Sequence, residues 1–170
     1  MANTYTLISS VTVGVGGSAT IDFTSIPQTY TDLQILVSGR SDTGNTGDYL
    51  LVNFNGSSAN LSSRTMGGFG PSSTFSGSEA TLFINILPAA NATANTFGNN
   101  SIYIPNYAGS NLKSGSIEGG FESNSVSNWF LFMTAGIWSQ TAAITSVKLD
   151  LLDGSFVQHS TAYLYGISNA

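Results

Sequence analysis

Cysteine is absent from this chain of 170 residues, and charged residues are scarce. Without cysteine the chain has no disulfide, no thiolate nucleophile and no cysteine-based zinc or iron–sulfur site. Lys and Arg number 4 and Asp and Glu number 9, so the net charge is -5 and charged residues make up only 8% of the chain. Because so few cations cannot neutralise a phosphate backbone or an anionic lipid surface, we expect neither nucleic acid nor membrane as a partner.

Long apolar runs are also lacking. The longest, from Trp129 to Trp138, is interrupted by Thr134 and Gly136, and it is about half of the ~20 residues that a membrane-spanning helix needs. The first residues carry no basic segment of the kind that opens a secretion signal. We therefore expect neither a targeting segment nor a membrane span.

Serine, threonine, asparagine and glycine make up nearly half of the chain, and no window has the apolar spacing of an amphipathic helix. Alternating or β-branched runs between turn residues instead predict an all-β protein of about ten strands. The expected strands are residues 5–13, 19–23, 32–38, 49–54, 81–87, 101–104, 112–121, 129–137, 144–152 and 162–167.

The connections between these runs indicate the architecture. Pairs such as Asn55-Gly56 and Asp153-Gly154 form tight hairpin turns, whereas residues 62–77 and 88–100 lack a strand pattern and predict long loops between sheets. This arrangement favours a single domain over residues 1–170, an antiparallel β-sandwich of the jelly-roll type. Residues 1–10 are a candidate docking arm, because chain ends become ordered only when they are tied down.

The expected strand at residues 129–137 is apolar on both faces. Leu131 and Met133 lie on one face, and Phe130 and Phe132 lie on the other. In an antiparallel sandwich this pattern predicts one face in the core and the other beneath a neighbouring chain or a covering loop.

Paired acids are the first candidates for catalysis, because a glycosidase needs two carboxyl groups across a sugar. Glu118 with Glu122 and Asp150 with Asp153 are the nearby pairs. We expect a bulge at Gly119-Gly120 to separate the first pair, and the second pair flanks a turn. We therefore predict no catalytic residue and no enzyme activity.

Other chemical motifs are weak. The one histidine, His159, would need a serine and an orienting acid nearby, and no Gly-x-Ser-x-Gly elbow is present. Asp42, Asn45 and Asp48 share a turn but do not form a calcium-loop motif. The glycine-rich stretch at 13–17 joins two strands and opens no helix, as a phosphate loop would. We expect neither a metal nor a cofactor.

Aromatic side chains in loops and at strand ends are the candidate contact residues, since such rings stack on sugars or fill subunit interfaces. Core packing is the alternative for each of them. The candidates are Tyr107, Trp138, Trp129, Phe130 and Phe132.

Five stretches carry a resemblance to a known family. They are residues 5–13 (YTLISSVTV), 21–33 (IDFTSIPQTYTDL), 102–111 (IYIPNYAGSN), 135–139 (AGIWS) and 160–166 (STAYLYG). In these phrases the chain resembles a family of small virion proteins of tailed bacteriophages from aquatic hosts. The resemblance implies a jelly-roll module, trimeric, placed on the head as a decoration protein or in a fibre, and it assigns no functional residues.

Composition and resemblance lead to the same expectation. We expect a non-enzymatic structural protein on the exterior of the virion, a capsid decoration (cement) protein that forms a homotrimer and docks on the major capsid protein. The alternative is the tip of a tail or head fibre that binds host-surface glycan, with residues 62–77 and 88–100 forming the rim of the site. The chain has no shaft-like repeat or coiled-coil segment, which favours decoration.

Overall fold

The computed structural model describes residues 4–70, 73–79, 84–125 and 128–168, and these residues form strands and no helix. Every pairing between neighbouring strands is antiparallel. The strands are β1 (Tyr5–Thr12), β2 (Thr20–Phe23), β3 (Asp32–Gly39), β4 (Gly47–Phe54), β5 (Leu61–Phe69), β6 (Ser73–Glu79), β7 (Ile84–Pro88), β8 (Gly98–Ile104), β9 (Lys113–Phe121), β10 (Phe130–Trp138), β11 (Val147–Leu151) and β12 (Thr161–Ile167).

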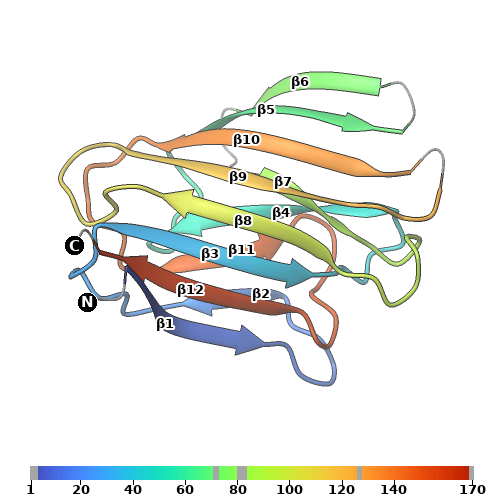
Figure 1. The fold of residues 1–170 in the computed structure, drawn as a ribbon, viewed down its shortest axis with the longest axis horizontal. Helices are drawn as coiled ribbons and strands as arrows, with labels where there is room; N and C mark the ends of the chain where they lie inside the picture. Colours follow the sequence, from blue (N-terminus) through green and yellow to red (C-terminus); the bar gives the residue numbers. More distant parts are fainter. Residues whose placement is uncertain (1–3, 71–72, 80–83, 126–127, 169–170) are drawn as a thin grey trace.

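The strands form two sheets that pack face to face. The larger sheet has the order β1-β12-β3-β8-β9-β10-β5-β6, and the smaller has the order β2-β11-β4-β7. In Figure 1 the larger sheet extends from β1 at the bottom to β6 at the top, with the smaller sheet behind it. The two ends of the described chain meet, since the Ser168 N–H donates to the Thr4 carbonyl at 3.0 Å. The prediction of an all-β antiparallel β-sandwich is confirmed.

The core follows from strand alternation. On β3, Leu33, Ile35 and Val37 are buried together on the predicted face, and Ala162 and Leu164 of the neighbouring β12 point the same way. Because successive side chains of a strand point to opposite faces, each such strand contributes one row to the space between the sheets. These rows meet similar rows from β2, β4 and β11 in one apolar cluster.

Strand β7 covers the part of the larger sheet that extends past the main core. It is buried along its whole length and packs against β8, β9 and β10. The Asn85 side chain of β7 donates to the carbonyls of Ile117 on β9 at 3.3 Å and Phe132 on β10 at 3.4 Å. These hydrogen bonds connect β7 to β9 and β10. Ile86 and Phe132 take part in a second, smaller apolar cluster there.

The structure corrects the expectation for residues 62–77. Within the described residues this stretch forms β5 and β6 rather than a loop, and β5 pairs with β10 from Leu61 to Phe69. Its glycines and hydroxyl residues conceal the alternation that an apolar strand would show, so tertiary pairing decides its structure. Each of the ten expected strands overlaps an observed strand, although residues 81–83 of one lie outside the described part.

A second correction concerns strand regularity at Gly119-Gly120. The pairing of β9 with β10 runs without a register shift from Lys113 to Phe121, so the expected bulge is wrong. The irregularity that does occur lies in β1, between Leu7 and Ser9 opposite β12. Residues 5–10 of the candidate docking arm belong to this edge strand, and residues 1–3 lie outside the described part.

Two of the four cations are buried and bind backbone carbonyls. The Arg40 guanidinium donates to the carbonyls of Thr93 at 2.8 Å and Thr96 at 3.0 Å, and also to those of Ala90 and Ala92. Its position fixes the loop between β7 and β8. Burial lowers the pKa of Arg40 below its ordinary value.

Candidate functional site on the outer face of the larger sheet

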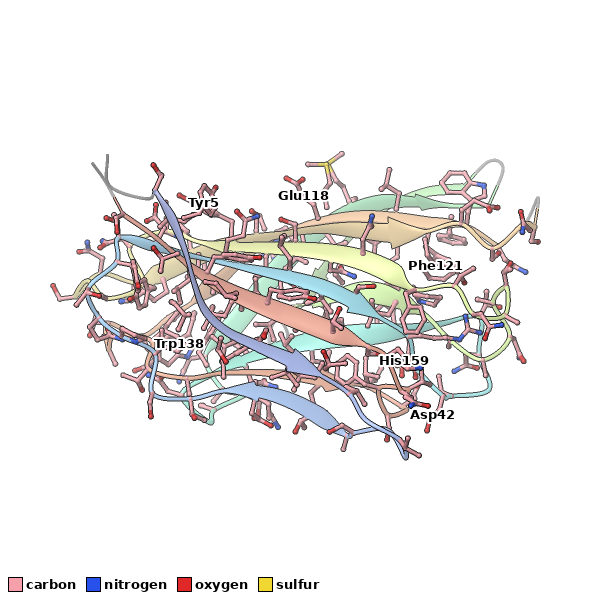
Figure 2. All side chains as sticks on the ribbon, turned by 60° about the horizontal axis from the view of Figure 1, so that its bottom comes forward. Tyr5, Asp42, Glu118, Phe121, Trp138 and His159 are labelled. Atoms are coloured by element: carbon pink, nitrogen blue, oxygen red, sulfur yellow. The ribbon has the colours of Figure 1, made fainter. Side chains whose placement is uncertain are left out.

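The outer face of the larger sheet, which points away from the smaller sheet, carries large exposed side chains on both sides of its centre. Figure 2 shows Tyr5 and Glu118 on this side, whereas Phe121 and Trp138 lie between the sheets. The strand register places one continuous row of residues across seven strands of this face. From β1 to β5 the row is Ser10, Tyr163, Leu36, Ser101, Glu118, Met133 and Met66.

Four exposed side chains of β10 and β5 form what we name the apolar patch: Leu131, Met133, Ile137 and Met66. Their exposed fractions are 61%, 53%, 45% and 63%. Leu131 stands between two glycines of the neighbouring strands, which leaves its flanks uncovered. The opposite face of β10 is buried. Of the two apolar faces that the sequence predicts for this strand, one therefore packs in the core and the other is exposed.

A groove of about 600 Å³ crosses the middle of the apolar patch, over β6, β5, β10 and β9. Met66 and Met133, which are register partners, line its floor. Arg64 of β5 and Glu118 of β9 line its opposite sides, with β10 between them. The groove is therefore apolar at its centre and carries one charge of each sign at its flanks.

A second groove, which we name the tyrosine groove, lies on the same face over β12, β3, β8, β9 and β10. Its volume is about 890 Å³. Its lining includes Tyr163 and Tyr165 from β12, Leu36 from β3, Ser101 from β8 and Glu118 from β9. Glu118 also lines the first groove, so the two grooves adjoin.

Side-chain hydrogen bonds fix the polar groups beside the tyrosine groove. The Gln34 amide donates to the Ser101 hydroxyl at 2.8 Å. The Tyr103 hydroxyl donates to the Asp32 carboxylate at 2.7 Å, and the other oxygen of Asp32 accepts the Asn106 N–H. The hydrogen bond to Asp32 raises the pKa of Tyr103, and desolvation raises it further.

Three of the predicted contact residues are buried in the core. Tyr107 is fully buried, and its hydroxyl donates to the Pro27 carbonyl. Trp138 packs against Phe54 with ring centroids 5.7 Å apart, and Phe132 belongs to the cluster beneath β10. These side chains do not reach the surface of the fold, so this geometry contradicts an external contact role for them and assigns them to packing.

The other two predicted contact residues are half-buried at one end of β10. Phe130 packs against Phe121 at 5.1 Å and Phe69 at 6.0 Å between ring centroids. Trp129 lies just before the strand, where its carbonyl accepts the Gly70 N–H. Phe130 and Trp129 both line the tyrosine groove. Part of each side chain is thus available at the rim of that groove.

The acid pairs occupy different settings. Glu118 lies on β9, whereas Glu122 follows the end of that strand at Phe121, and both residues line the tyrosine groove. Asp150 accepts a hydrogen bond from Lys148 at 2.9 Å. The Asp150 carboxylate is thus paired with a cation of its own strand, β11 (Val147–Leu151).

The buried Asp48 carboxylate organises the turn that suggested calcium. It accepts the Ser41 hydroxyl at 2.7 Å and the N–H groups of Asp153 at 3.2 Å and Gly154 at 3.0 Å. Its oxygens are therefore engaged by protein donors. His159 is exposed in a turn, with a φ of 73° and its N–H donated to Val13.

The part of the chain that the structure describes shows neither a metal-ligating cluster nor a membrane-spanning helix. No group of three or more His, Cys, Asp or Glu residues is placed to hold a metal ion there. Nor does the described part contain a helix long and apolar enough to cross a membrane. Comparison of the chain with known protein families, with characterised proteins and with solved structures gave no match.

Two groups of outer-face residues were not among the sequence candidates. The alternation of residues 162–167 contains the signal for Tyr163 and Tyr165, because buried Ala162 and Leu164 leave the tyrosines on the other face. Met66 had no such signal, since its strand was expected to be a loop. The sequence predicted contact residues in loops and at strand ends, whereas the candidate site in the structure lies on the outer face of the larger sheet.

Proposed function

We propose that this chain is a non-enzymatic structural protein of a phage virion, a capsid decoration protein that self-associates as a homotrimer and docks on the major capsid protein at the particle exterior. The observation that carries the proposal is the apolar patch. Contiguous exposed apolar side chains mark interaction surfaces, whereas single ones scattered over a surface need no explanation.

The charges beside the patch favour another copy of the same chain as its partner. Arg64 and Glu118 lie on opposite sides of β10, so an interface between copies would pair the cation of one with the acid of the next. The net charge of -5 over 170 residues opposes association only weakly. Burying one methionine or leucine side chain contributes about 1.5–3 kcal/mol, which the side chains of the patch would supply against the entropic cost of association.

The strand order supports a jelly roll as the form of the sandwich. Without the β5–β6 and β9–β10 hairpins, the sheets read β1-β12-β3-β8 and β2-β11-β4-β7. Strands adjacent in the chain then occupy equivalent positions in the two sheets: β1 with β2, β12 with β11, β3 with β4 and β8 with β7. This wrapping of antiparallel strand pairs supports a jelly roll, an arrangement that occurs in viral capsid proteins. The two hairpins extend one sheet and carry the apolar patch.

The experiment that tests this function is imaging of phage particles that contain the chain, at a resolution that traces the strands. We expect density for the sandwich on the capsid surface in regular multiples, with the outer face of β10 in a contact between copies. Density at the tail alone would contradict decoration, and density on the capsid with the apolar patch facing solvent would contradict the assigned interface.

A further inference from the structure

The tyrosine groove differs in chemistry from the apolar patch beside it. Tyr163, with 39% of its surface exposed, and Tyr165 line the end of the groove formed by β12. Leu36 of β3 lies directly beside Tyr163 in the register. An aromatic ring offers a flat face with negative charge density, which attracts the C–H groups of a sugar ring and still leaves the phenol hydroxyl for hydrogen bonding.

Polar side chains follow the tyrosines along the groove. Ser101 and Glu118 continue the register row across β8 and β9, and Asn99 lies on the same face of β8. Ser101 is already oriented by Gln34, so part of the polar lining is fixed before a ligand arrives. A few positioned polar groups on an otherwise apolar surface are typical of small-molecule sites.

The charge of the lining selects among ligands. Among the residues that line the tyrosine groove, the charged ones are Glu118 and Glu122, and none is basic. Carboxylates at this position repel phosphates, uronic acids and sialic acids. They accept hydrogen bonds from neutral hydroxyl groups, which favours an uncharged polyhydroxyl ligand.

The length of the groove argues against a single sugar ring as the ligand, and the paired backbone beneath it argues against an extended peptide. Tyr163 and Glu118 are three strand spacings apart in the register, or about 14 Å, which suits a short chain of sugar rings better than a single ring. The backbone groups beneath belong to strands paired on both sides, so an extended peptide cannot add to the sheet there. We propose that the tyrosine groove binds a neutral oligosaccharide.

The test uses the purified full-length chain on an array of neutral and acidic glycans, followed by calorimetric titration of the neutral oligosaccharide with the strongest signal. We expect neutral glycans to bind and acidic ones not to bind. Tyr163→Ala should weaken the neutral glycan by about tenfold or more, because it removes the ring of the binding surface.

A matched control is available on the other sheet. Tyr49 of β4 is 38% exposed, nearly the same as Tyr163, and it lies outside both grooves. Tyr49→Ala should leave the affinity unchanged. Glu122→Gln should keep neutral binding and admit acidic glycans, because Glu122 lines only the tyrosine groove and the change removes a repelling charge while retaining a hydrogen-bonding amide.

Several results would overturn the proposal: no neutral glycan bound by the wild-type chain, acidic glycans bound best, full affinity in Tyr163→Ala, or equal losses in the two tyrosine variants. If Tyr163→Ala does not fold, amide chemical shifts of the wild-type chain during the titration decide. Changes at Tyr163, Ser101 and Glu118 support the groove, and changes confined to other surfaces refute it. The oligomeric mass, measured separately, tests self-association through the apolar patch. A failure of glycan binding can therefore be told apart from a failure of self-association.

Discussion

The hydroxyl groups of Thr65 on β5 and Thr134 on β10 lie 2.9 Å apart, and both side chains are buried beneath the larger sheet. The two residues are register partners, so one hydrogen bond between side chains joins the β5–β6 hairpin to the rest of the sheet from the inner face. One hydroxyl donates and the other accepts in this buried hydrogen bond.

We predict strong coupling between these two threonines. Either single replacement, Thr65→Val or Thr134→Val, leaves one buried hydroxyl without its partner and should lower the free energy of unfolding by about 1–3 kcal/mol. The double variant removes both hydroxyls at nearly constant shape and should be close to wild type. Urea denaturation of the four proteins measures the cycle, and additive losses would refute the coupling.

Lys113 is the second buried polar group with a measurable contribution. The residue is only 2% exposed. Its ammonium donates to the carbonyls of Gly109 at 2.6 Å, Asn111 at 2.5 Å and Thr141 at 3.3 Å. Burial lowers the pKa of Lys113, which shows that desolvation opposes its charge. Three carbonyl acceptors offset this cost, so Lys113→Met should lower the free energy of unfolding by about 2 kcal/mol.

The same replacement at Lys148 is the control for Lys113. Lys148 is 37% exposed and pairs with Asp150 at 2.9 Å, and an exposed ion pair of this kind contributes less than about 1 kcal/mol. Denaturation of Lys113→Met and Lys148→Met under the same conditions gives the comparison. Equal stability of the two variants, or a more stable Lys113→Met, would mean that the three hydrogen bonds give Lys113 no larger net stabilisation than the exposed pair gives Lys148.

Tyr107 should make the protein sensitive to alkaline pH. Burial raises the pKa of Tyr107 in the folded state above its usual value of 10.0. The unfolded chain therefore loses this proton first, and the free energy of unfolding falls as the pH rises above the unfolded pKa toward the folded one. Below that window Tyr107 is neutral in both states and contributes no pH dependence.

The Tyr107→Phe variant isolates this effect. At neutral pH it should be less stable than wild type by about 1 kcal/mol, because the hydrogen bond to Pro27 is lost. Above about pH 10 the gap should narrow, since phenylalanine has no proton to lose. Urea denaturation across this range checks the trend, with Tyr49→Phe as the exposed control. A constant gap would show that Tyr107 does not titrate differently in the two states.

The sequence predicts the residues of the inner face of the larger sheet much better than those of its outer face. Alternation in residues such as Leu33, Ile35 and Val37 identified the inner face, because burial demands apolar side chains at every second position. The outer face has no such demand, so the alternation could place Tyr163 and Tyr165 there only by way of the buried Ala162 and Leu164, and it gave no sign of Met66. Tyr107 and Trp138 appeared to be contact residues because their local sequences resemble loops, yet long-range packing buries both.

The apolar patch gives the last prediction, a change of oligomeric mass. Met133→Lys places a charge at the centre of the patch and removes about 1.5–3 kcal/mol of apolar burial per interface, which corresponds to at least about tenfold weaker association. We expect wild-type mass in multiples of 17.7 kDa by sedimentation and a shift of Met133→Lys toward the monomer. Leu152→Lys is the control, because Leu152 is 49% exposed and its N–H binds the Tyr49 carbonyl on the smaller sheet. A monomeric wild-type chain at high concentration, or dissociation by both variants alike, would remove the patch as the interface.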